Sequence, residues 1–202
     1  MMNRRTFIAG GVAISALAGA APCPAFASAD PAALLVAAAQ AQIGVTTIYD
    51  GTYRRIAYPG GDVAPERGVC SDVVIRAYRA GIGLDLQQLV HEDMTANFPA
   101  YPANWGLARP DRHIDHRRVP NLQTFFARQG AELPPDERLR PGDLVTQTIA
   151  GRLPHISIVS ERSLRGSDRP LVVHNIGNGT EYADILTRFP VTGRFRYLPA
   201  AA

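Results

Sequence analysis

The sequence predicts a single α+β domain, in which helices come first and an antiparallel sheet comes last. Apolar residues recur at helical spacing only before about residue 130. From residue 143 onward they form short alternating runs separated by turn-rich pieces, which is typical of strands. The chain has 202 residues, 46% hydrophobic and 19% charged, a globular composition. Because helices and strands are segregated, alternating βαβ units are not expected.

The first 29 residues are predicted to be an export signal and not part of the fold. A basic start, NRRTFI, leads into an uncharged run from Phe7 to Ala21, and AFASA at 25–29 supplies small residues for cleavage. The paired arginines are typical of the twin-arginine variety. The run is shorter than the roughly 18 to 20 apolar residues that span a bilayer. We therefore expect an exported, periplasmic or secreted domain at 30–202 with no integral membrane segment.

Charge and cysteine content narrow the function classes. All 21 basic residues are arginine, and removing Arg4 and Arg5 leaves 19 against 18 acidic residues, a net charge of +1. This balance, without a basic stripe carrying aromatic residues, gives no reason to expect nucleic-acid binding. Cys23 falls in the predicted signal, so Cys70 is the one cysteine of the predicted mature chain and has no internal disulfide partner. It is buried and inert, paired with another chain, or reactive.

Three helices are predicted in the first half of the mature chain. Asp30 followed by Pro31 is a typical start for an alanine-rich helix that runs to about Ile43. A loop rich in Tyr, Gly and Pro covers 49–68. A second helix begins at Cys70 and is expected to end at Gly81, and a third covers 86–97.

The second half begins with a long ordered loop and continues with strands. Prolines and polar residues dominate 98–120, and NLQTFFARQG at 121–130 predicts a short helix closed by Gly130. The predicted strands are 143–149, 155–160, 170–176 and 192–198.

A cysteine and two histidines occupy positions suited to nucleophilic catalysis. Unpaired N–H groups and the helix dipole at a first turn favour an anion, so we expect a lowered thiol pKa for Cys70. An imidazole is the usual partner, because it takes the thiol proton and returns it to the leaving group. His155 and His174 lie in successive strand patterns, and if these strands pair, His174 can orient the His155 ring. Asp72 opposes thiolate formation.

These segments carry a resemblance to a known superfamily. GVCSDVVIRAYR at 68–79 resembles the nucleophile segment of the NlpC-type cysteine peptidases, papain-like bacterial cell-wall hydrolases. PGDLV, HISIVS and LVVHNIG resemble the strand before their catalytic histidine and the two strands that carry their histidines. YPGGDVAPERGVCSDVV and RHIDHRRVPNL are more similar still to an exported branch of that superfamily known only as a domain of unknown function. The similarity runs from about residue 43 to 197.

The resemblance implies a papain-like, NlpC-type domain with its nucleophile at a helix start packed on the sheet. It implies Cys70 as nucleophile, His155 as general base and acid, and His174 as the orienting residue. The Cys70 backbone N–H would help to form the oxyanion hole. The reaction implied is cleavage of an amide in peptidoglycan stem peptides through an acyl-enzyme, with no cofactor and no metal.

Several further residues are candidates for binding substrate or the oxyanion. An upstream tyrosine usually serves this site in the superfamily, and of Tyr49, Tyr53 and Tyr58 we favour Tyr58 or Tyr53. Asp72 stands where the peptidases have glycine, so the groove is expected to differ, and the bond cleaved stays open. Arginines suit substrate carboxylates. The candidates for this role are Arg54, Arg55, Arg67 and Arg76.

Three alternatives remain. One is a non-catalytic cell-wall-binding or partner-binding module on the same fold with Cys70 buried. Another is a metal-dependent hydrolase using His91, His113, Asp115 and His116, although their spacing matches no strong metal motif. An ion-pair network that pins the long loop is the favoured interpretation of these residues, with Asp115 and Arg117 as its best candidates. The third is acyl transfer by the same chemistry. The oligomeric state is open.

Overall fold

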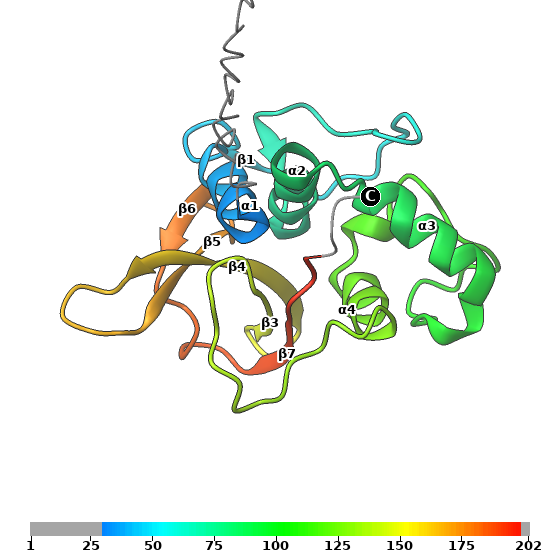
Figure 1. Cartoon of the computed structure of the whole chain (residues 1–202). Coiled ribbons are helices and arrows are strands. Elements are labelled where there is room, and N and C mark those ends of the chain that lie inside the picture. The colour runs from blue at the N-terminus through cyan, green and yellow to red at the C-terminus, as the bar shows by residue number, and fades with distance from the viewer. Residues whose placement is uncertain (1–29, 199–202) are drawn as a thin grey trace, which may run out of the picture.

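The computed structural model describes residues 30–198 and confirms an α+β domain with N-terminal helices and a C-terminal antiparallel sheet of five strands. Helices α1 and α2 lie side by side over the sheet, α4 packs beside β7, and α3 lies farther from the sheet (Figure 1). The predicted export signal lies outside the described residues. None of the helices at 30–198 is long and apolar enough to cross a membrane.

The first two helices begin as predicted and end differently. Helix α1, Pro31–Gln40, is capped by Asp30, whose carboxylate accepts the Ala32 N–H at 3.0 Å, and turns replace the expected helix beyond Gln40. Helix α2, Cys70–Ile82, passes through Gly81 and is closed by Gly83 at φ 71°. A Cβ at Gly81 would lie 2.7 Å from the Leu34 carbonyl oxygen of α1. Gly81 therefore permits close packing of the two helices and does not end α2.

The remaining helices frame the long loop. Helix α3, Leu86–Asn97, has the predicted bounds, and α4, Val119–Arg128, begins two residues before the predicted start. The loop between them contains two short 3-10 helices, η1, Phe98–Ala100, and η2, Asp115–Arg117.

The sheet has the order β6-β5-β4-β3-β7, with every neighbouring pair antiparallel. The four predicted strands are confirmed, and β6 was not predicted because its four residues follow a glycine-rich turn. A separate short parallel pair, β1 and β2, also lies in the segment expected to be loop. The strands are β1 Ile48–Tyr49, β2 Arg67–Gly68, β3 Leu144–Ile149, β4 Leu153–Ser163, β5 Pro170–Asn175, β6 Thr180–Ala183 and β7 Val191–Phe195.

Both faces of strand β4 are buried. Ile156 and Ile158 pack in the main core with the apolar residues of α1, α2 and α4. Val159 packs in a second, smaller core with Val172 of β5, on the opposite face. His155 is therefore held in a strand that is fixed from two sides.

Candidate active site

Cys70 is the first residue of α2, and its sulfur meets the edge of strand β4. The residue is 3% exposed, and Sγ accepts a hydrogen bond from the Ile156 backbone N–H. The pairing of β4 with β5 includes Ile158–Val173 but does not extend to Ile156, which leaves that N–H free for the thiol. Helix α2 thus delivers its cysteine to the residue directly after His155.

The two histidines form a hydrogen-bonded pair. His155 Nε2 and His174 Nδ1 lie 3.0 Å apart, and the rings meet edge to face at 86°. Burial lowers the pKa of His155 to about 3, with a further contribution from His174, and burial lowers the pKa of His174 to about 4. Both imidazoles are therefore neutral at neutral pH. The expected pairing of the rings is observed, and their catalytic roles stay predictions.

The Cys70 thiol is also neutral. Burial raises its pKa to about 11, and this effect outweighs the hydrogen bonds from Ile156, Ser71 and its own backbone N–H, which favour the thiolate. The charge of Asp72 raises the pKa further. The expected lowering of the thiol pKa by the helix start is therefore wrong for this structure, because desolvation dominates.

A buried ion pair stabilises the start of α2. Arg117 Nε and Nη2 each donate to an Asp72 carboxylate oxygen at 2.8 Å, and both side chains are 3% exposed. Asp72 also accepts the Val69 N–H at 2.7 Å, and Ser71 Oγ donates to the Arg117 carbonyl oxygen at 2.7 Å. Arg117 therefore compensates the carboxylate beside the thiol and attaches the long loop to α2. Its expected scaffolding role is confirmed.

A cavity of about 450 Å³, the Cys70 cleft, opens at the thiol. The long loop forms one wall, where the Arg118 guanidinium stacks 4.1 Å from the Trp105 ring centre. Pro154, the residue before His155, also lines this cavity. The residues that line the cleft include Tyr49, Tyr53, Cys70, Trp105, Arg117 and Pro154.

The three candidate tyrosines have separate positions. Tyr49 faces the thiol: burial raises its pKa to about 12, and the Cys70 and Asp72 charges and a hydrogen bond with Cys70 add to the shift. Tyr53 also lines the cleft, but its hydroxyl donates to Asp111 at 3.1 Å. The Tyr58 ring packs edge-on against His91 and lies outside the cleft lining. The position of Tyr49 therefore suits the oxyanion role for which Tyr58 or Tyr53 was favoured.

Comparison with known proteins identifies the family. A family described as "Domain of unknown function (DUF1287)" matches residues 36–197. The chain belongs to the DUF1287 family. A relative from Escherichia coli (strain K12), "Uncharacterized protein YijF", is 49% identical over 162 residues, which cover 79% of this chain and 78% of the relative. The expected similarity to a domain of unknown function is thus confirmed, and the NlpC-type relationship stays a prediction.

Arg76 of this DUF1287 chain is a structural clamp. Its guanidinium donates to both Asp62 carboxylate oxygens at 2.7 and 3.1 Å and to Thr46 Oγ1 at 2.9 Å. The remaining donors bind backbone carbonyls of the 63–67 segment. All three nitrogens are engaged and the residue does not line the Cys70 cleft, so its position does not suit the expected contact with substrate.

The proposed metal ligands do not converge. His113 Nδ1 lies 3.0 Å from the Ile56 carbonyl oxygen, and Asp115 is buried against Arg118 at 2.7 Å. His116 is buried separately, and burial, together with the charge of Arg117, lowers its pKa to about 3. Between residues 30 and 198, no group of three or more His, Cys, Asp or Glu side chains is placed to hold a metal ion. The alternative of a metal hydrolase built on these residues therefore lacks its site.

Proposed function

We propose that this DUF1287 protein is an exported cysteine hydrolase of papain-like, NlpC-type architecture that cleaves an amide bond in peptidoglycan stem peptides. One observation carries the proposal. The Cys70 sulfur lies at a helix start against the residue next to His155, and His155 is hydrogen-bonded to His174 behind Pro154, the lining residue that precedes His155. The stem peptide as substrate comes from the sequence resemblance.

The proposed mechanism follows from the hydrogen bond between the histidines. If His155 Nε2–H donates to His174 Nδ1, the Nδ1 lone pair of His155 is free to act as the base. His155 removes the thiol proton as Cys70 Sγ bonds to the amide carbonyl carbon. The carbonyl oxygen takes up negative charge and accepts hydrogen bonds from the Cys70 backbone N–H and the Tyr49 hydroxyl. His155 then protonates the leaving amine, and the C–N bond breaks.

The second half of the cycle releases the acyl group. His155 removes a proton from water, the hydroxide oxygen bonds to the thioester carbon, and the C–S bond breaks. The sulfur regains its proton from His155. Because the thiol pKa is about 11 and the His155 pKa about 3, a thiolate–imidazolium pair is not the resting state. Proton transfer therefore accompanies attack on the carbonyl and does not precede it.

A second candidate is a binding module on the same fold. It is favoured by one observation: Cys70 is 3% exposed with a strongly raised pKa, which also describes an inert core thiol. The hydrolase needs Cys70 to cleave a bond in its substrate, whereas the binding module leaves its ligand chemically unchanged.

The test is mass spectrometry of purified muropeptides after incubation with the protein and with Cys70→Ser. We expect products that appear only with the cysteine, and their masses will identify the bond cleaved. The absence of Cys70-dependent products would overturn the hydrolase and leave the binding module. A product joined to an amine or hydroxyl acceptor would instead assign acyl transfer. Circular dichroism of both proteins controls for folding.

A further inference from the structure

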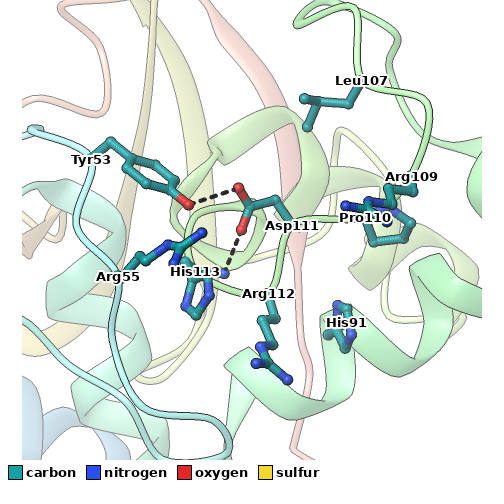
Figure 2. Close-up of a pocket in the computed structure, with 9 residues that line it drawn as sticks. All are labelled: Tyr53, Arg55, His91, Leu107, Arg109, Pro110, Asp111, Arg112 and His113. Atoms are coloured by element: carbon teal, nitrogen blue, oxygen red, sulfur yellow. Dashed lines mark hydrogen bonds between the residues drawn. The ribbon is translucent and has the colours of Figure 1, made fainter.

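A second cavity, of about 600 Å³, lies beside the Cys70 cleft and shares Tyr53 with it. Figure 2 shows that Tyr53 and Arg55 enter from the segment before β2, whereas Arg109, Asp111 and Arg112 come from the long loop. His91 of α3 closes another side. We call this cavity the arginine pocket, after Arg55, Arg109 and Arg112. A ligand extending from the thiol past Tyr53 would enter it.

The arginine pocket carries positive charge that the protein leaves uncompensated. Arg55, Arg109 and Arg112 form no salt bridge within residues 30–198, in contrast to their neighbour Arg54, which pairs with Asp50 at 3.2 Å. Asp111 is the one acidic residue of the lining. Its carboxylate already accepts the Tyr53 hydroxyl at 3.1 Å and the His113 N–H at 2.9 Å.

One neighbouring contact supports a binding role. The Arg112 guanidinium lies 5.5 Å from the centre of the Tyr58 ring, which restricts its position without using its in-plane donors. The pocket thus combines three guanidinium groups that have no ionic partner among the described residues. Residues 30–202 contain 19 arginines and 18 acidic residues, which nearly balance. The excess of positive charge at this pocket is therefore local and not a property of the whole domain.

We propose that the arginine pocket binds a free carboxylate of the peptide whose amide occupies the Cys70 cleft. This inference rests on the proposed function and names its substrate class: stem peptides that keep an unmodified carboxylate. A planar guanidinium matches a carboxylate with two parallel hydrogen bonds, and this match favours the carboxylate over an amide. The wall shared at Tyr53 allows one ligand to reach both cavities.

The test measures binding without turnover. Cys70→Ser protein is titrated calorimetrically with a synthetic stem peptide and with the same peptide whose carboxyl groups are all amidated. We expect the amidated peptide to bind about tenfold more weakly or worse, the loss expected for one charge-assisted hydrogen bond. Adding Arg112→Gln or Arg109→Gln should weaken binding of the acid about tenfold and leave binding of the amide unchanged. Arg112→Lys keeps the charge but loses the fork, so it should restore only part of the affinity.

Arg165→Gln is the matched control. It removes one exposed positive charge in the hairpin between β4 and β5, away from the arginine pocket, and should leave both affinities unchanged. Equal affinity for acid and amide, or an equal loss in Arg165→Gln, would overturn the proposal. Inorganic phosphate is titrated in parallel. Binding of phosphate without binding of the peptide would also overturn the proposal, because it would make the pocket a phosphate site.

The outcomes separate this inference from the hydrolase. Discrimination between acid and amide that depends on Arg112, combined with no Cys70-dependent products, keeps the pocket and removes the hydrolase. Cleavage by the wild-type protein that is indifferent to amidation keeps the hydrolase and removes the pocket.

Discussion

Replacing Arg117 by methionine is expected to destabilise the protein strongly. Arg117 and Asp72 are each 3% exposed and share two hydrogen bonds of 2.8 Å. The variant would leave a buried carboxylate whose remaining partner is the Val69 N–H. Removing one member of a buried ion pair costs about 3–5 kcal/mol. For a domain of this size, that corresponds to a fall in Tm of about 10 °C.

The measurement is equilibrium unfolding in urea, with the m-value checked for a change in the transition. Asp72→Asn combined with Arg117→Met removes both charges and should be more stable than Arg117→Met alone. Arg54→Met is the control, because that arginine is half exposed and pairs at the surface, where ion pairs contribute little. A loss below about 1 kcal/mol in Arg117→Met, or a double variant less stable than both single variants, would refute the reasoning.

Three further outcomes are expected. Alkylation of folded Cys70 should be slow at neutral pH and accelerate about tenfold per pH unit toward pH 10, because the thiol pKa is about 11. Fast alkylation near pH 7 that does not depend on pH would contradict this and indicate a thiolate–imidazolium pair. The free energy of unfolding should fall as the pH is lowered from 6.5 to 4. The folded pKa values of His116, His155 and His174 are about 3, 3 and 4, below the unfolded value of about 6.5, so the unfolded state binds more protons in this range. Each histidine that is fully protonated only in the unfolded state lowers the free energy of unfolding by about 1.4 kcal/mol per pH unit. Urea midpoints that stay constant over this range would contradict it. Under the proposed function, Tyr49→Phe should lower kcat roughly 100-fold, whereas Tyr58→Phe should leave kcat unchanged. Both variants are measured by steady-state kinetics on the identified muropeptide. A larger loss of kcat in Tyr58→Phe than in Tyr49→Phe would reject Tyr49 as an oxyanion donor.

Local patterns were sufficient to predict most of the elements. Helix α3 was predicted with its observed bounds, and the structure shows that Asp85 caps its start. The four longer strands followed from alternation and their bounding turns. Gly81 was misassigned as a helix end because a packing glycine and a terminating glycine look alike in one sequence. Only its approach to Leu34 separates them.

The site was predictable in its types of residue and less so in its partners. The juxtaposition of His155 and His174 followed from pairing of successive strands. The preference for Tyr58 and Tyr53 over Tyr49 could not be corrected from spacing. Tyr49 reaches the thiol because β1 pairs with β2, setting Tyr49 opposite Gly68, and such two-residue strands leave no usable pattern. The raised thiol pKa depends on burial, which the helix-start argument did not include.

The partnership between Asp72 and Arg117 has a consequence for how the chain acquires its site. The two residues are 45 positions apart, and helix α3 and the long loop lie between them. A chain folded only as far as α3 has its cysteine helix but lacks both the guanidinium that compensates Asp72 and the wall that encloses the sulfur. The nucleophile's environment therefore requires the completed long loop as well as strand β4, which supplies Ile156 and His155. Deletions that shorten this loop would remove the nucleophile's environment even where every helix and strand is kept.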